Sequence, residues 1–160
     1  MDLIKELLGN WKFAVGQRYE LLSVLKDSDL AFTPQGSEKF KDLQYQFACI
    51  GSTEKAYTEM IKNGLKFDVS LFSKIKDDLV KLHTTTELKT KLEEIDRGFE
   101  DTIKNFSGDE VFDWGDTTSP VWRLITVLQE HERLHHGQLI TYFTLADIEF
   151  PDNFKKMWNL

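Results

Sequence analysis

The amino-acid sequence predicts an all-α protein, and more specifically a four-helix bundle. Apolar residues recur at spacings of three and four in long stretches, which is the period of a helix with one buried face. No segment shows the convincing alternation of apolar and polar residues that marks a half-buried strand. The connections are long enough to cross the end of a bundle. With 160 residues, the chain is expected to form one domain, residues 1–160, around a single core.

The first two helices are predicted over Leu3–Lys26 and Ser37–Asn63. Thr33-Pro34 is a stop signal after the first helix, because the residue before a proline disfavours helical geometry. Asn63-Gly64 is expected to end the second, since glycine commonly follows the last helical residue. Residues 66–83 are less regular, and they are predicted to form a connector with one or two helical turns between helices two and three.

The third helix is predicted to begin near Thr84, where Thr84 and Glu87 have the spacing of a capping box. The largely polar residues 109–118 that follow it are predicted to be a loop. Ser119-Pro120 then provides a capping hydroxyl and a proline suited to a first helical turn. The fourth helix is therefore expected to start there and to run to about Asp147.

Composition and charge exclude several classes of protein. There are 20 Lys and Arg against 27 Asp and Glu, and the net charge of −7 argues against nucleic acid or an anionic membrane as a partner. No apolar run approaches the ~18 residues of a membrane span, and Met1–Asn10 lacks the pattern of a targeting signal. One unpaired cysteine suits a reducing compartment, so a cytoplasmic location is expected.

The last predicted helix carries polar residues in the middle of its inward-facing stripe. Burying imidazoles there costs a few kcal/mol unless each finds a partner. His131 and His135 are four residues apart, so their side chains lie on one side of the helix and are placed to share a metal ion. Core histidines satisfied by hydrogen bonds are the competing interpretation. In heptad steps, the stripe consists of Val121, Leu124, Leu128, His131, His135, Gln138, Tyr142 and Leu145.

A third ligand is expected from a facing helix, because a metal with an open position usually has three protein ligands. Cys49, in the middle of the second helix, is the remaining soft donor, although an isolated helical cysteine is most often a small buried apolar residue. His83 is expected to be solvated in the connector, and His136 to lie at the rim of the site. Gly137 costs about 1 kcal/mol relative to alanine, so a backbone or ligand is expected to approach it closely.

Residues 131–135, H-E-R-L-H, also fit the motif H-E-x-x-H, in which the two histidines bind zinc and the glutamate is the general base of a metallopeptidase. In this chain that glutamate is Glu132. The extended form of that motif needs glycine at position 138 and histidine at position 141, where this chain has Gln138 and Thr141. Such peptidases hold their substrate on the edge of a sheet, and no sheet is predicted. The metallopeptidase interpretation is therefore the weaker one.

The run HERLHHGQLITYF, from His131 to Phe143, resembles the final-helix signature of the DinB-like superfamily of metal-binding four-helix bundles, which includes the YfiT-like proteins. Alignment on Gly137-Gln138 places the family's two metal-binding histidines on His131 and His135. The length and layout of nearly the whole chain are also similar to that family. The resemblance therefore implies the same bundle with a metal at its centre.

A second run, QFACIGSTE from Gln46 to Glu54, resembles the family pattern Q-F-A-H-I-x-x-x-E, in which the histidine is the third ligand. Cys49 stands at that histidine position. A Cys-His-His site suits Zn²⁺, Ni²⁺ or a similar divalent ion. The alternative is that the substitution has cost the chain a ligand and the metal with it.

The resemblance implies an activity as well as a metal, because characterised members of the family include transferases and isomerases that use bacillithiol or mycothiol. The first hypothesis is a metal-dependent S-transferase, in which a low-molecular-weight thiol attacks a small electrophilic substrate. Hydrolysis with Glu132 or Glu54 as the base is a variant. Glu54, Gln138 and Tyr142 are expected to orient a ligand or line the pocket. Dimerisation is common in the family, so a homodimer is a further expectation.

Two other hypotheses remain open from the sequence. One is that the protein is a degenerate bundle that binds a structural metal, a small ligand or nothing. The other is that Cys49 is itself a nucleophile activated by His131 or His135. The second of these predicts rapid alkylation of Cys49 in the metal-free protein and protection when metal is added.

Overall fold

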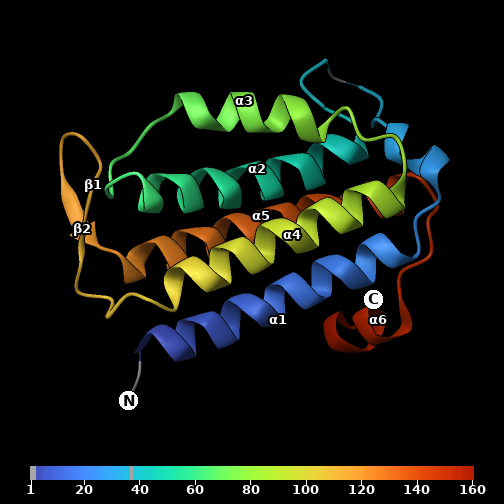
Figure 1. The fold of residues 1–160 in the computed structure, drawn as a ribbon. Helices are drawn as coiled ribbons and strands as arrows, with labels where there is room; N and C mark the ends of the chain where they lie inside the picture. Colours follow the sequence, from blue (N-terminus) through green and yellow to red (C-terminus); the bar gives the residue numbers. More distant parts are fainter. Residues whose placement is uncertain (1–2, 37) are drawn as a thin grey trace.

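The computed structural model describes residues 3–36 and 38–160, and it confirms the all-α class (Figure 1). Four long helices form the bundle: α5 packs against α1 and α2, and α4 packs against the same two helices. A shorter helix, α3, covers the outer side of α2, and α6 packs on α1. The elements are α1 (Leu3–Ser23), the 3₁₀ helix η1 (Asp27–Ala31), α2 (Leu43–Lys62), α3 (Ser70–Leu79), α4 (Thr85–Ile103), β1 (Val111–Asp113), β2 (Thr118–Pro120), α5 (Trp122–Leu145) and α6 (Asp152–Trp158).

The bundle core consists of two large apolar clusters with a polar layer between them. One cluster contains Trp11, whose ring lies 5.1 Å from that of Phe99. The other contains Phe47 and Phe143. The residues between the two clusters include Arg18, Glu54, Asp96 and Glu132, one from each bundle helix, and all are buried. The centre of the molecule is therefore polar rather than apolar.

The second helix starts later than the sequence predicts. The predicted start at Ser37 lies outside the described residues, and residues 38–42 are turn and loop. The helix begins at Leu43, where the side chain of Asp42 accepts a hydrogen bond from the backbone amide of Tyr45 at 2.8 Å. This aspartate supplies the N-cap that the sequence analysis did not assign. At the other end, the predicted stop at Asn63 is confirmed.

The start of the third long helix agrees with the sequence prediction, whereas the connector before it does not. The capping box of α4 is confirmed, because Thr84 accepts from the amide of Glu87 at 3.1 Å and Glu87 accepts from the amide of Thr84 at 3.2 Å. The connector before it is more ordered than predicted, since α3 has 10 residues rather than one or two turns. None of the helices in the described ranges is both long and apolar enough to cross a membrane.

The expected loop before α5 contains a small antiparallel hairpin, and Ser119-Pro120 belongs to its second strand rather than to the helix. Ser119 pairs with Phe112, and its hydroxyl accepts from the indole nitrogen of Trp114 at 2.7 Å. The N-cap position is occupied by Val121, without a side-chain cap, and α5 begins at Trp122. Strands of 3 residues are too short to give a readable alternation.

The inward-facing stripe of α5 follows the sequence prediction at its start and departs from it at its end. Leu124 and Leu128 are buried as expected, but Gln138 is exposed and Leu145 is 60% exposed. Their place is taken by other residues, including Phe143, which is fully buried. A straight helix has 3.6 residues per turn, so a stripe traced in sevens rotates by about 20° per heptad and leaves the core.

Candidate metal centre

Three side chains with metal-binding atoms meet between α2 and α5, and they are the three predicted from the sequence. Nε2 of His131 lies 3.2 Å from Nε2 of His135 and 3.9 Å from Sγ of Cys49. The ligand atoms of the three residues all lie within 4.8 Å of one another. Cys49 and His131 are half-buried, and His135 is buried. The site is therefore reachable from one side and enclosed on the other.

A chain of hydrogen bonds fixes the orientation of His135. The hydroxyl of Tyr142 donates to the carbonyl of Lys41 at 2.7 Å, so its oxygen is left to accept from the amide nitrogen of Gln46 at 3.1 Å. That assignment turns Oε1 of Gln46 toward Nδ1 of His135, 3.0 Å away. Because an amide oxygen only accepts, Nδ1 carries the proton. The lone pair of His135 is then on Nε2 and points toward the other two donors.

Two of the three separations among these donors fit a tetrahedral divalent metal. Around a tetrahedral zinc ion, two imidazole nitrogens are about 3.3 Å apart, and a nitrogen and a sulfur are about 3.6 Å apart. The separations of 3.2 Å and 3.9 Å between His131 and its two neighbours are close to these values. Two imidazole nitrogens at that distance repel through their lone pairs unless a proton or a cation lies between them. Thiolate and imidazole are also the donors that zinc and similar ions prefer.

Burial controls the protonation of the three ligands. It lowers the pKa of His131, and together with the neighbouring His131 it lowers the pKa of His135 to about 4. Both imidazoles are therefore neutral at physiological pH, which is the form that binds metals. Burial raises the pKa of Cys49, and the positive charge of Lys76 offsets part of that increase. The thiol is thus protonated at neutral pH and has to lose its proton when it binds a metal.

A second polar group, the Arg18 cluster, fills the centre of the bundle beside these ligands. We define it as Arg18, Asp96, Glu132, Glu54 and His136. Arg18 donates from Nη2 to both oxygens of Asp96, at 2.5 and 2.7 Å, and from Nη1 to Glu132 at 3.1 Å. Arg18 and Asp96 are buried residues that were not predicted from the sequence. The available signal was a charged residue on the apolar face of each predicted helix.

Glu132 and Glu54, the two predicted bases, both lie in the Arg18 cluster. One oxygen of Glu132 accepts from Arg18, and the other lies 3.2 Å from Nε2 of His136. Burial favours a higher pKa for Glu132, but Arg18 and His136 outweigh it and hold the pKa below its usual value. Glu54 lies 3.9 Å from Arg18, and burial together with Asp96 raises its pKa well above normal.

Three residues near His131 and His135 lie in surroundings that differ from those expected from the sequence. His136 is 3% exposed and belongs to the Arg18 cluster, so it is not a rim residue. Gln138 is exposed, and it contributes only a minor hydrogen-bonding interaction with His135. Gly137 is exposed, and a side-chain carbon added there would meet nothing within 4 Å, so no close approach requires it. Tyr142 is buried and bonded to Gln46, and His83 is exposed as expected.

The close approach in the bundle occurs instead at Gly51 on α2. A side-chain carbon at this position would lie 2.5 Å from Leu92 and 3.3 Å from Leu79. This glycine therefore lets α2 pack tightly against α3 and α4 on the side away from the metal ligands. Nothing in the local sequence distinguishes it from other helical glycines.

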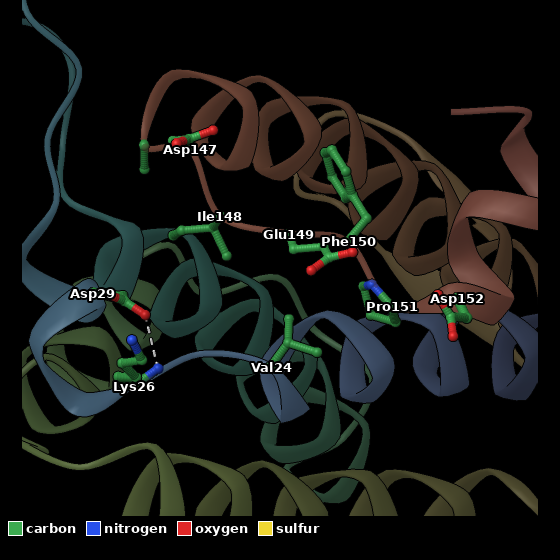
Figure 2. Close-up of a pocket in the computed structure, with 10 residues that line it drawn as sticks. Val24, Lys26, Asp29, Asp147, Ile148, Glu149, Phe150, Pro151 and Asp152 are labelled. Carbon is green, nitrogen blue, oxygen red and sulfur yellow. Dashed lines mark hydrogen bonds between the residues drawn. The ribbon is translucent and has the colours of Figure 1, made fainter.

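A large cavity of the protein does not coincide with the candidate metal centre. A cavity of about 730 Å³ lies beyond the end of α5, where Asp147 to Asp152 pass the end of α1 (Figure 2). The described residues that line it include Asp29, Asp147, Glu149 and Asp152, and no histidine or cysteine is among them. This cavity starts about three helical turns from His135. The chemistry of the donors, rather than cavity size, identifies the candidate site.

Comparison with known sequences gives no family for this chain. The sequence matches no family model, and no curated protein sequence is significantly similar to it.

Solved structures with the same fold do exist. A DinB-like protein from Bacillus cereus superposes with a TM-score of 0.70 at 16% identity, covering 94% of this chain and 98% of that chain. An uncharacterised protein from Escherichia coli UTI89 gives a TM-score of 0.72 at 13% identity, with the same coverage of 94% and 98%. A mycothiol-dependent maleylpyruvate isomerase gives a TM-score of 0.67 at 9% identity and 85% coverage of this chain, which spans only 60% of that isomerase. The chain has the fold of the DinB-like helical bundles.

Proposed function

We propose that Cys49, His131 and His135 bind a divalent metal ion. The observation that carries this proposal is the convergence of three ligand atoms from two facing helices, all within 4.8 Å of one another. Three protein ligands leave one coordination position open to another molecule. An ion held there would act as a Lewis acid that lowers the pKa of a bound thiol or water.

The surrounding residues have supporting roles in this proposal. Gln46 holds the proton on Nδ1 of His135 and keeps Nε2 directed at the site, and Tyr142 fixes the orientation of Gln46. Such partners of a metal-binding histidine commonly change metal affinity by 10–100-fold. Cys49 contributes its sulfur after losing its proton. Its raised pKa makes it a poor nucleophile without metal, so a ligand role is favoured over covalent catalysis.

We infer that the ligand of the open position is a low-molecular-weight thiol, which makes the protein a metal-dependent enzyme of the thiol-transferase type. The thiolate would attack a small electrophilic substrate. The fold shared with a mycothiol-dependent isomerase supports this choice. Hydrolysis is less favoured, because both oxygens of Glu132 are engaged by Arg18 and His136, and Glu54 faces the same arginine. The same engagement of Glu132 disfavours a metallopeptidase.

The second candidate function is a structural metal site with no catalytic role. One observation favours it: a cavity of about 730 Å³ lies away from the three ligands, at Asp147 to Asp152. In that case the metal stabilises the contact between α2 and α5, and no thiol binds to it.

Metal analysis tests the binding proposal directly. Protein purified without added metal is expected to contain close to one divalent ion per chain by inductively coupled plasma mass spectrometry. Cys49→Ala and His135→Ala are expected to lose it, whereas Cys49→His restores a third nitrogen ligand and retains it. His83→Ala, which removes an exposed histidine, is the matched control. A metal content that is negligible in the wild type, or unchanged in Cys49→Ala and His135→Ala, contradicts the proposal.

Thiol binding separates the two candidate functions. In cobalt-substituted protein, a thiol that enters the open position adds a thiolate-to-cobalt absorption band to the one from Cys49. An increase that saturates with added thiol supports the transferase-type site. A stoichiometric metal with no spectral response to any thiol supports the structural site.

A further inference from the structure

A lysine from α3 is held beside the half-buried side of the candidate metal centre. Nζ of Lys76 donates to the phenol oxygen of Tyr45 at 3.0 Å and lies 4.8 Å from the centroid of its ring. Tyr45 precedes Cys49 by four residues on α2, so the two side chains are neighbours on one side of the helix. Because α3 covers the outer side of α2, Lys76 reaches this position from outside the bundle (Figure 1).

The charge of Lys76 acts on the sulfur of Cys49. Burial raises the pKa of the thiol and Lys76 opposes this, while the Tyr45 bond and the interaction with Cys49 both raise the pKa of Lys76. An ammonium group has three donors, and Tyr45 uses one of them. No carboxylate among the described residues forms an ion pair with Lys76, although Asp77 is close enough to raise its pKa slightly. In a chain with a net charge of −7, this cation at the site is therefore available to an anion.

We propose that Lys76, positioned by Tyr45, binds the anionic group of the ligand that occupies the candidate metal centre, and that this ligand is a small thiol bearing a carboxylate near its sulfur. The separation of Tyr45 and Cys49 by four residues, a rise of about 6 Å, places the ammonium within reach of a carboxylate one or two carbons from the sulfur. The identity of the ligand as a thiol rests on the proposed function. The proposed attraction of an anion to Cys49 by Lys76 is independent of that function.

The first experiment needs no metal. Iodoacetate is an anion and iodoacetamide is neutral. Both alkylate the Cys49 thiolate: the S–C bond forms as the C–I bond breaks and iodide leaves. The chain has a single cysteine, so the mass of the intact protein reports on this site alone. Both reagents react with the same thiolate, so the ratio of the two rates cancels the effect of its pKa. The ratio then measures the electrostatic attraction at the sulfur.

In low salt, Lys76→Met is expected to lower the ratio of the iodoacetate rate to the iodoacetamide rate by about three- to ten-fold, as for unit charges roughly 6 Å apart at an effective dielectric constant of about 40–80. Lys76→Arg is expected to preserve most of the ratio. Lys74→Met, on an exposed residue of the same helix, makes the same change in net charge and is expected to leave the ratio unchanged. Equal ratios in the wild type and Lys76→Met, or equal decreases in Lys76→Met and Lys74→Met, would overturn the proposal.

The second experiment tests the ligand class in cobalt-loaded protein. Mercaptoacetate and 3-mercaptopropionate are expected to bind more tightly than 2-mercaptoethanol, measured by the thiolate-to-cobalt absorption band. This preference should disappear in Lys76→Met and persist in Lys74→Met. The same preference in both variants would overturn the assignment of the carboxylate to Lys76. Protein that takes up no cobalt refutes the metal proposal instead, and the alkylation ratio still decides whether Lys76 attracts anions to Cys49.

Discussion

Oε1 of Gln46 lies 3.0 Å from Nδ1 of His135 and accepts a hydrogen bond from it. This contact joins α2 to α5 directly behind the candidate metal centre. Since Gln46 is itself oriented by the hydroxyl of Tyr142, the tautomer of one histidine depends on residues from two helices and a loop carbonyl. The orientation of His135 is therefore set by residues that are not themselves candidate metal ligands.

Replacement of Gln46 is expected to weaken metal binding without removing a ligand. Gln46→Ala should lower the affinity of the protein for Zn²⁺ by about 10–100-fold, because His135 loses the acceptor that fixes its tautomer. Tyr142→Phe, which leaves Gln46 in place, should have a smaller effect. A competition titration with a zinc-binding dye measures both. An unchanged affinity in Gln46→Ala would show that packing alone orients the imidazole.

Removal of Arg18 is expected to destabilise the fold strongly. Arg18→Met leaves Asp96 and Glu132 buried without their cation, which typically costs about 3–5 kcal/mol of unfolding free energy. Lys12→Met removes an exposed pair with Glu100 and should cost no more than about 1 kcal/mol. Urea denaturation compares the two variants. A cost below about 1 kcal/mol for Arg18→Met would mean that the buried carboxylates are neutralised in another way.

Acidification is expected to destabilise the metal-free protein through His135. The pKa of His135 is lowered to about 4 by burial and by His131, whereas an exposed imidazole titrates near 6.5. The folded state thus binds fewer protons than the unfolded state between these values, so this contribution to stability is present above pH 6.5 and is lost as the pH falls toward 4. The loss is at most about 3 kcal/mol.

Urea denaturation of the chelator-treated protein at a series of pH values measures this effect. His135→Gln should lose less stability than the wild type over the same range, because the titrating group is gone. His83→Gln, on an exposed side chain, is the matched control. If the wild type and His135→Gln have parallel pH profiles, the imidazole is not protected in the folded protein.

Two glycines in helices are expected to respond to alanine in opposite directions. Gly137→Ala should raise the unfolding free energy by up to about 1 kcal/mol, because the added methyl group meets nothing and alanine favours the helix. Gly51→Ala places a carbon 2.5 Å from Leu92 and should cost about 1–3 kcal/mol through overpacking. Thermal unfolding distinguishes them. Stabilisation by both substitutions would mean that α2 and α4 separate easily at this contact.

The amino-acid sequence is enough to predict the helical class, the capping box of α4 and the three residues that converge between α2 and α5. These features depend on short-range patterns. A capping box links residues three apart, and the histidine pair depends on a spacing of four, so both survive an error in the ends of a helix. Cys49 was found through its place in a local pattern resembling that of a known family. That pattern lies inside α2, so the assignment of Cys49 does not depend on whether the helix starts at Ser37 or at Leu43.

Which polar residues lie inside the bundle and which lie outside depends on how the helices pack against one another. The exact twist of α5 turns Gln138 outward and His136 inward, and a stripe traced in heptads cannot distinguish them because it rotates away from a straight helix. Likewise, the burial of Arg18 depends on carboxylates from other helices that meet it after long separations in sequence, as with Asp96. A lone charge is costly to bury, and four charged side chains from four helices become compatible with a core only when the fold brings them together.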